Sequence, residues 1–274
     1  GEVKVRKKEM GGGVHHVLEV DHPKKQFSAD DFVKKATQAI SMIYHNENIP
    51  IVVGGTGFYI DALLGRIILP EVPPNPKLRK RLQKKNIEKL FAMLKKVDPE
   101  RAKTIDKYNP VRLIRAIEIA AWRGRKNPEG GSAARSARGL SKFSAENFRT
   151  PEGLLSGAFY DVLWLGITFP IEMLEKKINK RLGTRIKQGM IIEAKKLHTQ
   201  GLSYKRMEEL GLEYRSLARY LQKEISKEEM TAELQSAIRN YAKRQMRWFK
   251  RNKNIHWIKN KTEAVQLTKA FLKP

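Results

Sequence analysis

The sequence predicts an α/β fold, and three observations support that prediction. Two compact apolar runs, Ile49 to Val53 and Asp161 to Phe169, have the near-continuous hydrophobicity of buried parallel strands. Apolar residues at helical spacing surround both runs, as in the segment that begins at Ser28. Gly54 to Gly57 follows the first run and precedes another helical pattern, which is the strand–turn–helix order of α/β proteins.

Capping residues and apolar stripes predict the principal helices. Ser28 with Asp31, and Ser226 with Glu229, have the spacing of a capping box at a helix start. A third long helix is expected from Pro170 to about Met190, with Arg181 and Arg185 beside its apolar stripe, where a basic side chain can reach into a cleft. The helix after Ser226 places these residues on one line: Met230, Leu234, Ile238, Tyr241, Gln245 and Trp248.

A proline cluster from Pro70 to Pro76 predicts a boundary, after which the chain becomes helical and very basic. In a helix from about Val111 to Trp122, Arg112 and Arg115 lie one turn apart and could bridge neighbouring phosphates. A solvated basic face explains the same pattern. From Gly124 to Gly157 the composition changes to Gly, Ser, Ala, Arg and Asn, which predicts a loop.

Composition limits the classes of partner. The 274 residues include 55 Lys+Arg and 29 Asp+Glu, a net charge of +26, and an excess of this size favours a polyanion such as nucleic acid. The absence of cysteine excludes disulfides and thiolate–metal sites. No apolar run is as long as a membrane span and no secretory segment opens the chain, so we expect a cytoplasmic protein. We also expect a monomer.

The glycine loop from Gly54 to Gly57 has two interpretations. Backbone N–H groups at a helix start suit an anion or a closely approaching substrate, whereas a tight turn between packed elements needs the same glycines. The chain contains no G-x-x-x-x-G-K-[ST] phosphate-binding motif, so nucleotide hydrolysis has no support.

Collinear phrases along nearly the whole chain resemble the tRNA dimethylallyltransferase family, also called tRNA isopentenyltransferase. They are KKEMGGGVHHVLEV, the stretch from Phe27 to Phe32, IPIVVGGTGFYIDALL, LPEVPPNPKLRKRL, VDPERAKTIDKYNPVRLIRAIEI, INKRLGTRIKQGMIIEAKKL, LGLEYR and YAKRQMRWFKR. The resemblance implies transfer of a dimethylallyl group from dimethylallyl diphosphate to the N6 amine of the adenosine beside the tRNA anticodon, with Mg²⁺ as cofactor. It also implies a P-loop kinase-like parallel-sheet core over residues 1–66 and 155–274, and a helical insertion domain over residues 67–154 that binds tRNA.

The resemblance also assigns site residues. Arg181 would hold the diphosphate, and Arg181 and Thr56 would be catalytic. Contacts with tRNA would come from Thr56, Arg79, Val111, Arg112, Leu113, Ile114, Arg115, Leu210, Gly211, Leu212, Glu213, Tyr214 and Arg215. We assign no residue of this chain to a metal site.

The chain departs from the family pattern at its start. Family members begin with a G-P-T-A-S-G-K-[ST] loop and an Asp-Ser segment whose Asp is the general base, and neither occurs here. We therefore expect weak or no turnover from these residues alone, and an unpaired edge at Ile49 to Val53. Two alternatives to the transferase are a non-catalytic tRNA-binding remnant and a basic RNA-binding protein unrelated to prenyl transfer.

Overall fold

The structure, a computed structural model, describes residues 13–18, 20–126 and 160–273. The chain divides into two compact units. The α/β unit lies within Gly1–Ile67 and Phe159–Pro274, and the helical unit lies within Ile68–Ala158. That the helical unit serves as a tRNA-binding insertion stays a prediction.

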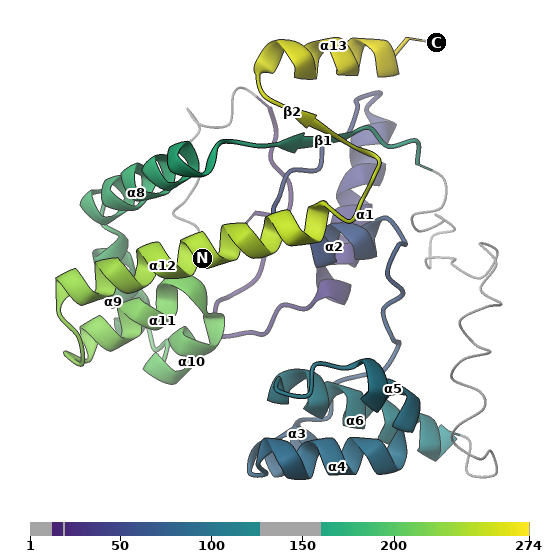
Figure 1. Cartoon of the computed structure of the whole chain (residues 1–274), viewed down its shortest axis with the longest axis vertical. Helices are drawn as coiled ribbons and strands as arrows, with labels where there is room; N and C mark the ends of the chain where they lie inside the picture. Colours follow the sequence, from purple (N-terminus) through teal and green to yellow (C-terminus); the bar gives the residue numbers. More distant parts are fainter. Residues whose placement is uncertain (1–12, 19, 127–159, 274) are drawn as a thin grey trace. The chain divides into compact units, whose positions relative to one another are not determined.

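Most described residues are helical, and a small parallel sheet completes the structure (Figure 1). The α/β unit contains α1 (Ala29–His45), α2 (Gly57–Leu63), β1 (Trp164–Ile167), α8 (Ile171–Lys187), α9 (Met190–Thr199), α10 (Tyr204–Leu210), α11 (Leu212–Leu221), α12 (Lys227–Phe249), β2 (Ile255–Ile258) and α13 (Lys261–Phe271). The helical unit contains α3 (Pro76–Gln83), α4 (Ile87–Val97), α5 (Pro99–Thr104) and α6 (Pro110–Lys126).

The sheet joins β1 to β2 in parallel, with Trp164 opposite Ile255 and Ile167 opposite Ile258. Parallel neighbours need a long crossover, because the chain must return to the same end of the sheet. Here the crossover runs through α8 to α12 (Figure 1). This small parallel sheet among helices is consistent with the predicted α/β class.

The strand predicted from Ile49 to Val53 is wrong. These residues are described, but they have no strand assignment and no ladder partner among the described residues. The side chains of Ile51 and Val53 are 82% and 90% exposed. A β-branched run favours extended backbone, yet a ladder also needs a neighbouring strand, which a local pattern cannot supply.

The helix predicted from Pro170 to Met190 is interrupted. Helix α8 ends at Lys187, and Gly189 adopts φ +100°, a left-handed conformation that glycine accepts readily. Met190 therefore begins α9. A single core holds these helices together, built from Leu182, Met190, Ala194, Leu202, Met207, Tyr214, Leu217, Ala218, Met230 and Leu234.

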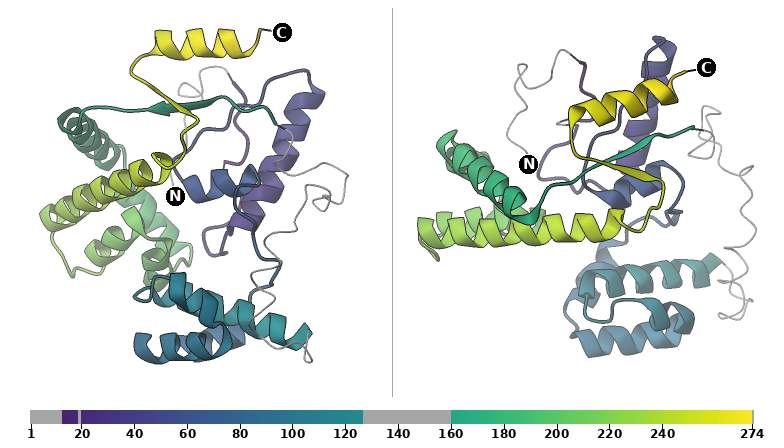
Figure 2. Two further views of the ribbon diagram at one scale, coloured as in Figure 1. Left: turned by 45° about the vertical axis from the view of Figure 1, so that its right-hand side comes forward. Right: turned by 45° about the horizontal axis from the view of Figure 1, so that its top comes forward.

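Both predicted capping boxes are confirmed. Ser28 and Asp31 exchange side-chain-to-backbone hydrogen bonds at the start of α1, and Ser226 and Glu229 do so at the start of α12. Helix α12 continues beside α8 and α11 in every view (Figures 1 and 2). Its carboxyl-terminal half reaches α2, so it can shape the glycine loop that precedes that helix.

The helical unit has its own hydrophobic core. Helices α4 and α6 lie side by side (Figure 2) and surround fully buried leucines with smaller neighbours: Leu82, Leu90, Leu94, Ala102, Leu113, Ile114, Ala116 and Ile117. Side chains of Asn75, Asn86 and Asp98 cap the short helices α3, α4 and α5. Each cap satisfies an N–H group that would otherwise lack a partner within its helix.

Two further predictions, a loop after α6 and the absence of a membrane span, can be compared with the described residues only. The loop expected from Gly124 to Gly157 falls outside the described residues from 127 onward. Among the helices that the structure describes, none is both long and apolar enough to cross a membrane.

Candidate functional site

The glycine loop presents Thr56 at the start of α2. Thr56 occupies the N-cap position, but its side chain accepts no hydrogen bond from the helix backbone. Its Oγ1 instead lies 3.2 Å from the hydroxyl oxygen of Tyr241 on α12, so these two hydroxyls share a hydrogen bond. The side chain of Thr56 is exposed, which leaves it accessible to a ligand.

Helix α12 fixes the shape of this loop by close packing. A Cβ at Gly55 would lie 1.8 Å from Nε2 of Gln245, and one at Gly57 would lie 2.1 Å from Cδ1 of Trp248. The Trp248 ring is itself held, because its Nε1 donates to Oδ2 of Asp61 at 2.7 Å. Gly57 is therefore needed for close approach, whereas at Gly55 the flexible end of the Gln245 side chain can move aside. The contact at Gly57 favours a packed turn as the first role of this loop.

Tyr241, Gln245 and Trp248 recur at helical spacing, so one face of α12 meets the loop. The sequence places them on one line but gives no sign that Tyr241 reaches Thr56. That contact joins residues 185 positions apart. Only the fold brings the two hydroxyls together.

Helix α8 carries two arginines in different surroundings. Arg181 is exposed. Arg185, one turn later, is largely buried and donates from Nη1 to Oε1 of Glu213 on α11. This ion pair fixes α11 against α8, whereas Arg181 lies where a ligand can reach it.

The segment from Leu210 to Arg215 links α10 to α11. Gly211 has φ +75° and ends one helix while starting the next. Tyr214 points into the core, and its hydroxyl donates to Oε1 of Glu193 at 3.1 Å. Burial, followed by the nearby Glu193 carboxylate, raises the pKa of the Tyr214 hydroxyl. The buried Tyr214 side chain is not available to RNA, whereas the next residue, Arg215, is exposed.

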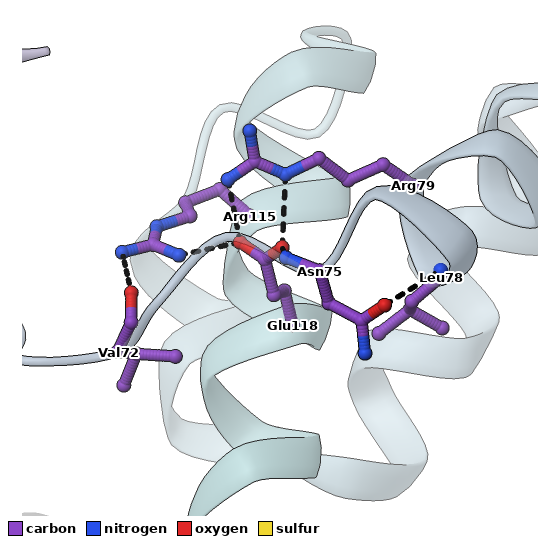
Figure 3. Close-up of polar contacts among 6 residues, drawn as sticks. All are labelled: Val72, Asn75, Leu78, Arg79, Arg115 and Glu118. Carbon is purple, nitrogen blue, oxygen red and sulfur yellow. Dashed lines mark hydrogen bonds and ion pairs between the residues drawn. The ribbon is translucent and has the colours of Figure 1, made fainter.

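A buried carboxylate organises the candidate residues of the helical unit (Figure 3). Glu118 on α6 is 1% exposed. Its Oε1 accepts from the backbone N–H of Asn75 at 2.6 Å and from Nε of Arg79 at 2.9 Å. Its Oε2 accepts from Nη2 of Arg79 at 2.7 Å and from Nη1 of Arg115. Arg115 also donates from Nη2 to the carbonyl oxygen of Val72 at 2.9 Å.

These donors keep Glu118 ionised. Burial by itself raises the pKa of a carboxyl group, because it disfavours the charged form. Hydrogen bonds from Arg79, from the Asn75 backbone and from Arg115 outweigh that effect, and the pKa of Glu118 is lowered from its ordinary value. The cluster is therefore one carboxylate shared by two guanidinium groups.

The predicted segment from Val111 to Arg115 divides by burial. Val111 and Arg112 are exposed, and Arg112 lies 3.9 Å from the Asp106 carboxylate. Leu113 and Ile114 are buried in the helical core, so their side chains are not available to RNA.

The structure thus brings Arg79 and Arg115 together, an arrangement that helical spacing alone did not indicate. Glu118 was missed as a site residue, although two signals were present. It follows Arg115 by three positions, and it is the only acidic residue between Pro110 and Lys126.

Nothing in the described part of the chain forms a metal site. No group of three or more histidine, aspartate or glutamate side chains there is placed to hold an ion. The described residues therefore offer no set of three protein ligands for the expected Mg²⁺.

Comparison with known proteins places the chain in a family. The profile of the family described as IPP transferase matches residues 1–252. A protein named tRNA dimethylallyltransferase 1, from Geotalea uraniireducens, is 33% identical over 269 residues, which cover 97% of this chain and 81% of that protein.

Solved structures agree with this assignment. The full-length tRNA isopentenylpyrophosphate transferase of Bacillus halodurans matches with a TM-score of 0.60 and 27% identity, over 98% of this chain and 79% of that one. A eukaryotic dimethylallyltransferase acting on tRNA has the same fold at 19% identity, with a TM-score of 0.75 over 98% of this chain and 68% of that one. The chain belongs to the IPP transferase family, a family of transferases.

Proposed function

We propose that this protein transfers a dimethylallyl group from dimethylallyl diphosphate to the N6 amine of the adenosine beside the tRNA anticodon. A bond forms between N6 and the first carbon of the prenyl group. The bond from that carbon to oxygen breaks, its electron pair leaves with the diphosphate, and N6 gives up one proton. The target base must leave its stack for this attack.

The observation that carries this proposal is the match with tRNA dimethylallyltransferases over nearly the entire chain. The net charge of +26 suits a tRNA substrate, and the exposed arginines suit phosphate recognition. Neither feature would identify prenyl transfer without the match. We expect the protein to act in the cytoplasm as a monomer.

The roles we propose follow the predicted sites. Arg181 holds the diphosphate and offsets the charge that develops on it as it leaves. Thr56 of the glycine loop, Arg79 and Arg115 of the helical unit, and Arg215 of α11 contact tRNA. Arg112 adds a second exposed cation on α6.

We further propose that the α/β unit is built on a parallel core of the P-loop kinase type. The parallel pairing of β1 with β2 across a long helical crossover supports this assignment.

The test is a prenylation assay with intact tRNA, dimethylallyl diphosphate and magnesium. The readout is the mass of the anticodon-arm fragment. A gain of one prenyl unit, lost when the target adenosine is replaced by guanosine, supports the function and overturns our expectation of weak turnover. Without a gain, preferential binding of the anticodon stem-loop over a scrambled RNA of equal length agrees with that expectation. The absence of both the mass gain and the binding preference would contradict the proposal.

Arg181→Ala refines the test. We expect it to weaken binding of dimethylallyl diphosphate about tenfold while tRNA binding is retained, because one charge-assisted contact is lost. Lys187→Ala, also exposed on α8, is the matched control and should leave both ligands unaffected. An equal loss of tRNA binding in the Arg181 variant would contradict the assigned role.

A further inference from the structure

We propose that Glu118 is a positioning residue for tRNA recognition. Its buried carboxylate holds the guanidinium groups of Arg79 and Arg115 together so that their outer N–H groups receive backbone phosphates. Glu118 touches neither tRNA nor the reacting atoms, and it acts through the two arginines. The inference rests on the proposed function, because it concerns how the same tRNA is bound.

The buried Glu118 carboxylate holds the guanidinium groups of both arginines. Arg79 meets Glu118 in a bidentate fork through Nε and Nη2, which sets the plane of its guanidinium group. Arg115 is held at two points, by the Glu118 carboxylate and by the Val72 carbonyl. A guanidinium held in this way has little rotational freedom left.

The same carboxylate also sets the backbone that carries Arg79. It accepts the N–H of Asn75, whose own side chain caps α3 by accepting from the N–H of Leu78 at 3.0 Å. Figure 3 shows these contacts converging on Glu118. One buried group therefore ties the loop at Val72, the start of α3 and the face of α6 into one arrangement.

The cluster keeps a positive charge on its outer side. Two guanidinium groups share one carboxylate, so the three side chains together carry +1. The side chains of Arg79 and Arg115 remain 27% and 33% exposed, while that of Glu118 is 1% exposed. Each guanidinium retains N–H groups, including Nη1 of Arg79 and Nε of Arg115, that donate to no acceptor among the described residues.

Such an arrangement suits binding better than stability. A carboxylate taken out of water is costly, and an apolar side chain at this position would often serve the core as well. Holding two arginines in place before tRNA arrives lowers the conformational entropy lost on binding. A phosphate that approaches also meets two planar donors, which an unrestrained lysine pair would not offer.

Glu118→Gln separates this role from simple electrostatics by the sign of its effect. The substitution removes a negative charge, so attraction to RNA alone predicts tighter binding of the anticodon stem-loop. The positioning role predicts binding weakened about tenfold, because the fork to Arg79 is lost and its guanidinium is free to rotate. Affinity should be measured across a salt series. The slope of log K against log salt is negative, and the loss of one ordered phosphate contact should reduce its magnitude by about 1.

Three further variants address folding and charge. Leu94→Ala removes buried volume from the same core without touching the cluster, and it should destabilise the unit without changing affinity or salt slope below its melting temperature. Glu100→Gln removes an exposed carboxylate from the same unit, so it measures what the loss of one negative charge alone does to binding, and binding should be equal or slightly tighter. Arg115→Lys keeps the charge but loses the two-point hold, and it should weaken binding as Glu118→Gln does.

The outcomes distinguish this inference from the proposed function. Weaker binding and a smaller slope for Glu118→Gln and Arg115→Lys, with normal binding for Leu94→Ala, support the positioning role. Equal or tighter binding by folded Glu118→Gln overturns it, and so does normal binding by Arg115→Lys. If the unaltered protein shows no preference for the anticodon stem-loop, the proposed function fails first.

Discussion

The two units of this protein hold arginine in opposite ways. In the α/β unit, Arg185 and Glu213 form a largely buried one-to-one ion pair whose charges cancel. In the helical unit, Glu118 is shared by Arg79 and Arg115, and the outer side of both arginines stays partly exposed. The Arg185–Glu213 pair only joins two helices. The cluster of Arg79, Arg115 and Glu118, here called the open cluster, also leaves a net positive charge that a ligand can reach.

The comparison shows that arginine spacing says little about arginine use. Arg181 and Arg185 lie one turn apart, as Arg112 and Arg115 do, yet one member of each pair is tied into the fold and the other is exposed. The carboxylate that binds Arg185 is Glu213, which lies on another helix. The carboxylate that binds Arg115 is Glu118, which lies three positions later on the same helix. Arg185 and Arg115 each donate to a carboxylate that is largely or fully buried, whatever its distance along the chain.

The largest test of the comparison is Arg185→Ala. It leaves Glu213 without its cation in a largely buried site, and we expect the free energy of unfolding to fall by about 3 kcal/mol. Arg79→Ala is the matched change in the open cluster, and it should cost about 1 kcal/mol because Arg115 and the Asn75 N–H still satisfy Glu118. Urea unfolding of both variants measures the difference. Equal losses would show that the two arrangements are not distinct.

The second test concerns packing rather than charge. Gly57→Ala would push a methyl group onto the Trp248 ring, which cannot yield freely because Asp61 holds it, and we expect a loss of about 2 kcal/mol. Gly54→Ala, in the same loop, meets nothing within 4 Å and should change stability by less than about 0.5 kcal/mol. Thermal unfolding of the two variants is the measurement. A harmless Gly57→Ala would mean that α12 does not shape the loop.

How far the sequence predicts this molecule depends on the range of each interaction. Capping boxes at Ser28 and Ser226 depend on residues three apart, and both are confirmed. The β1 run was predicted because apolar residues are nearly continuous from Val162 to Ile167, although in the structure only alternate residues of the strand are partly buried. The run from Ile49 to Val53 is also apolar, but it contains Pro50 and has no ladder partner among the described residues, and pairing is a property of two segments.

The candidate site follows the same rule. Family phrases indicated Thr56, Arg79 and Arg115, but not what holds them. Tyr241 reaches Thr56 across 185 positions, and Glu118 reaches Arg79 across 39. Those partners depend on how helices pack, which residue spacing along the chain does not reveal.

The third test uses pH to probe the open cluster. Because the folded protein lowers the pKa of Glu118 below its ordinary value of 4.5, the cluster contributes its full stability above that pH. The contribution is lost as pH falls through the lowered value, when the carboxyl group takes up a proton. We expect the melting temperature of the unaltered protein to exceed that of Glu118→Gln by about 3 °C at pH 7, with the gap narrowing as the pH falls below 4.5. A gap that is constant with pH would show that the charge of Glu118 does not stabilise the cluster.

The smallest expected effect on stability belongs to Tyr241→Phe. The shared hydrogen bond between Tyr241 and Thr56 lies at an exposed site, so water replaces it and the free energy of unfolding should change by less than about 0.5 kcal/mol. Tyr220→Phe on α11 provides a control for the loss of a tyrosine hydroxyl outside the loop. If α12 holds the Thr56 side chain for tRNA, Tyr241→Phe should nonetheless weaken binding of the anticodon stem-loop about threefold, and Thr56→Ala should abolish any further effect of the tyrosine change. Additive losses in the double variant would mean that Tyr241 contacts the RNA itself or serves another group. The α/β unit would then place its hydroxyls independently, unlike the arginines that the helical unit couples through Glu118.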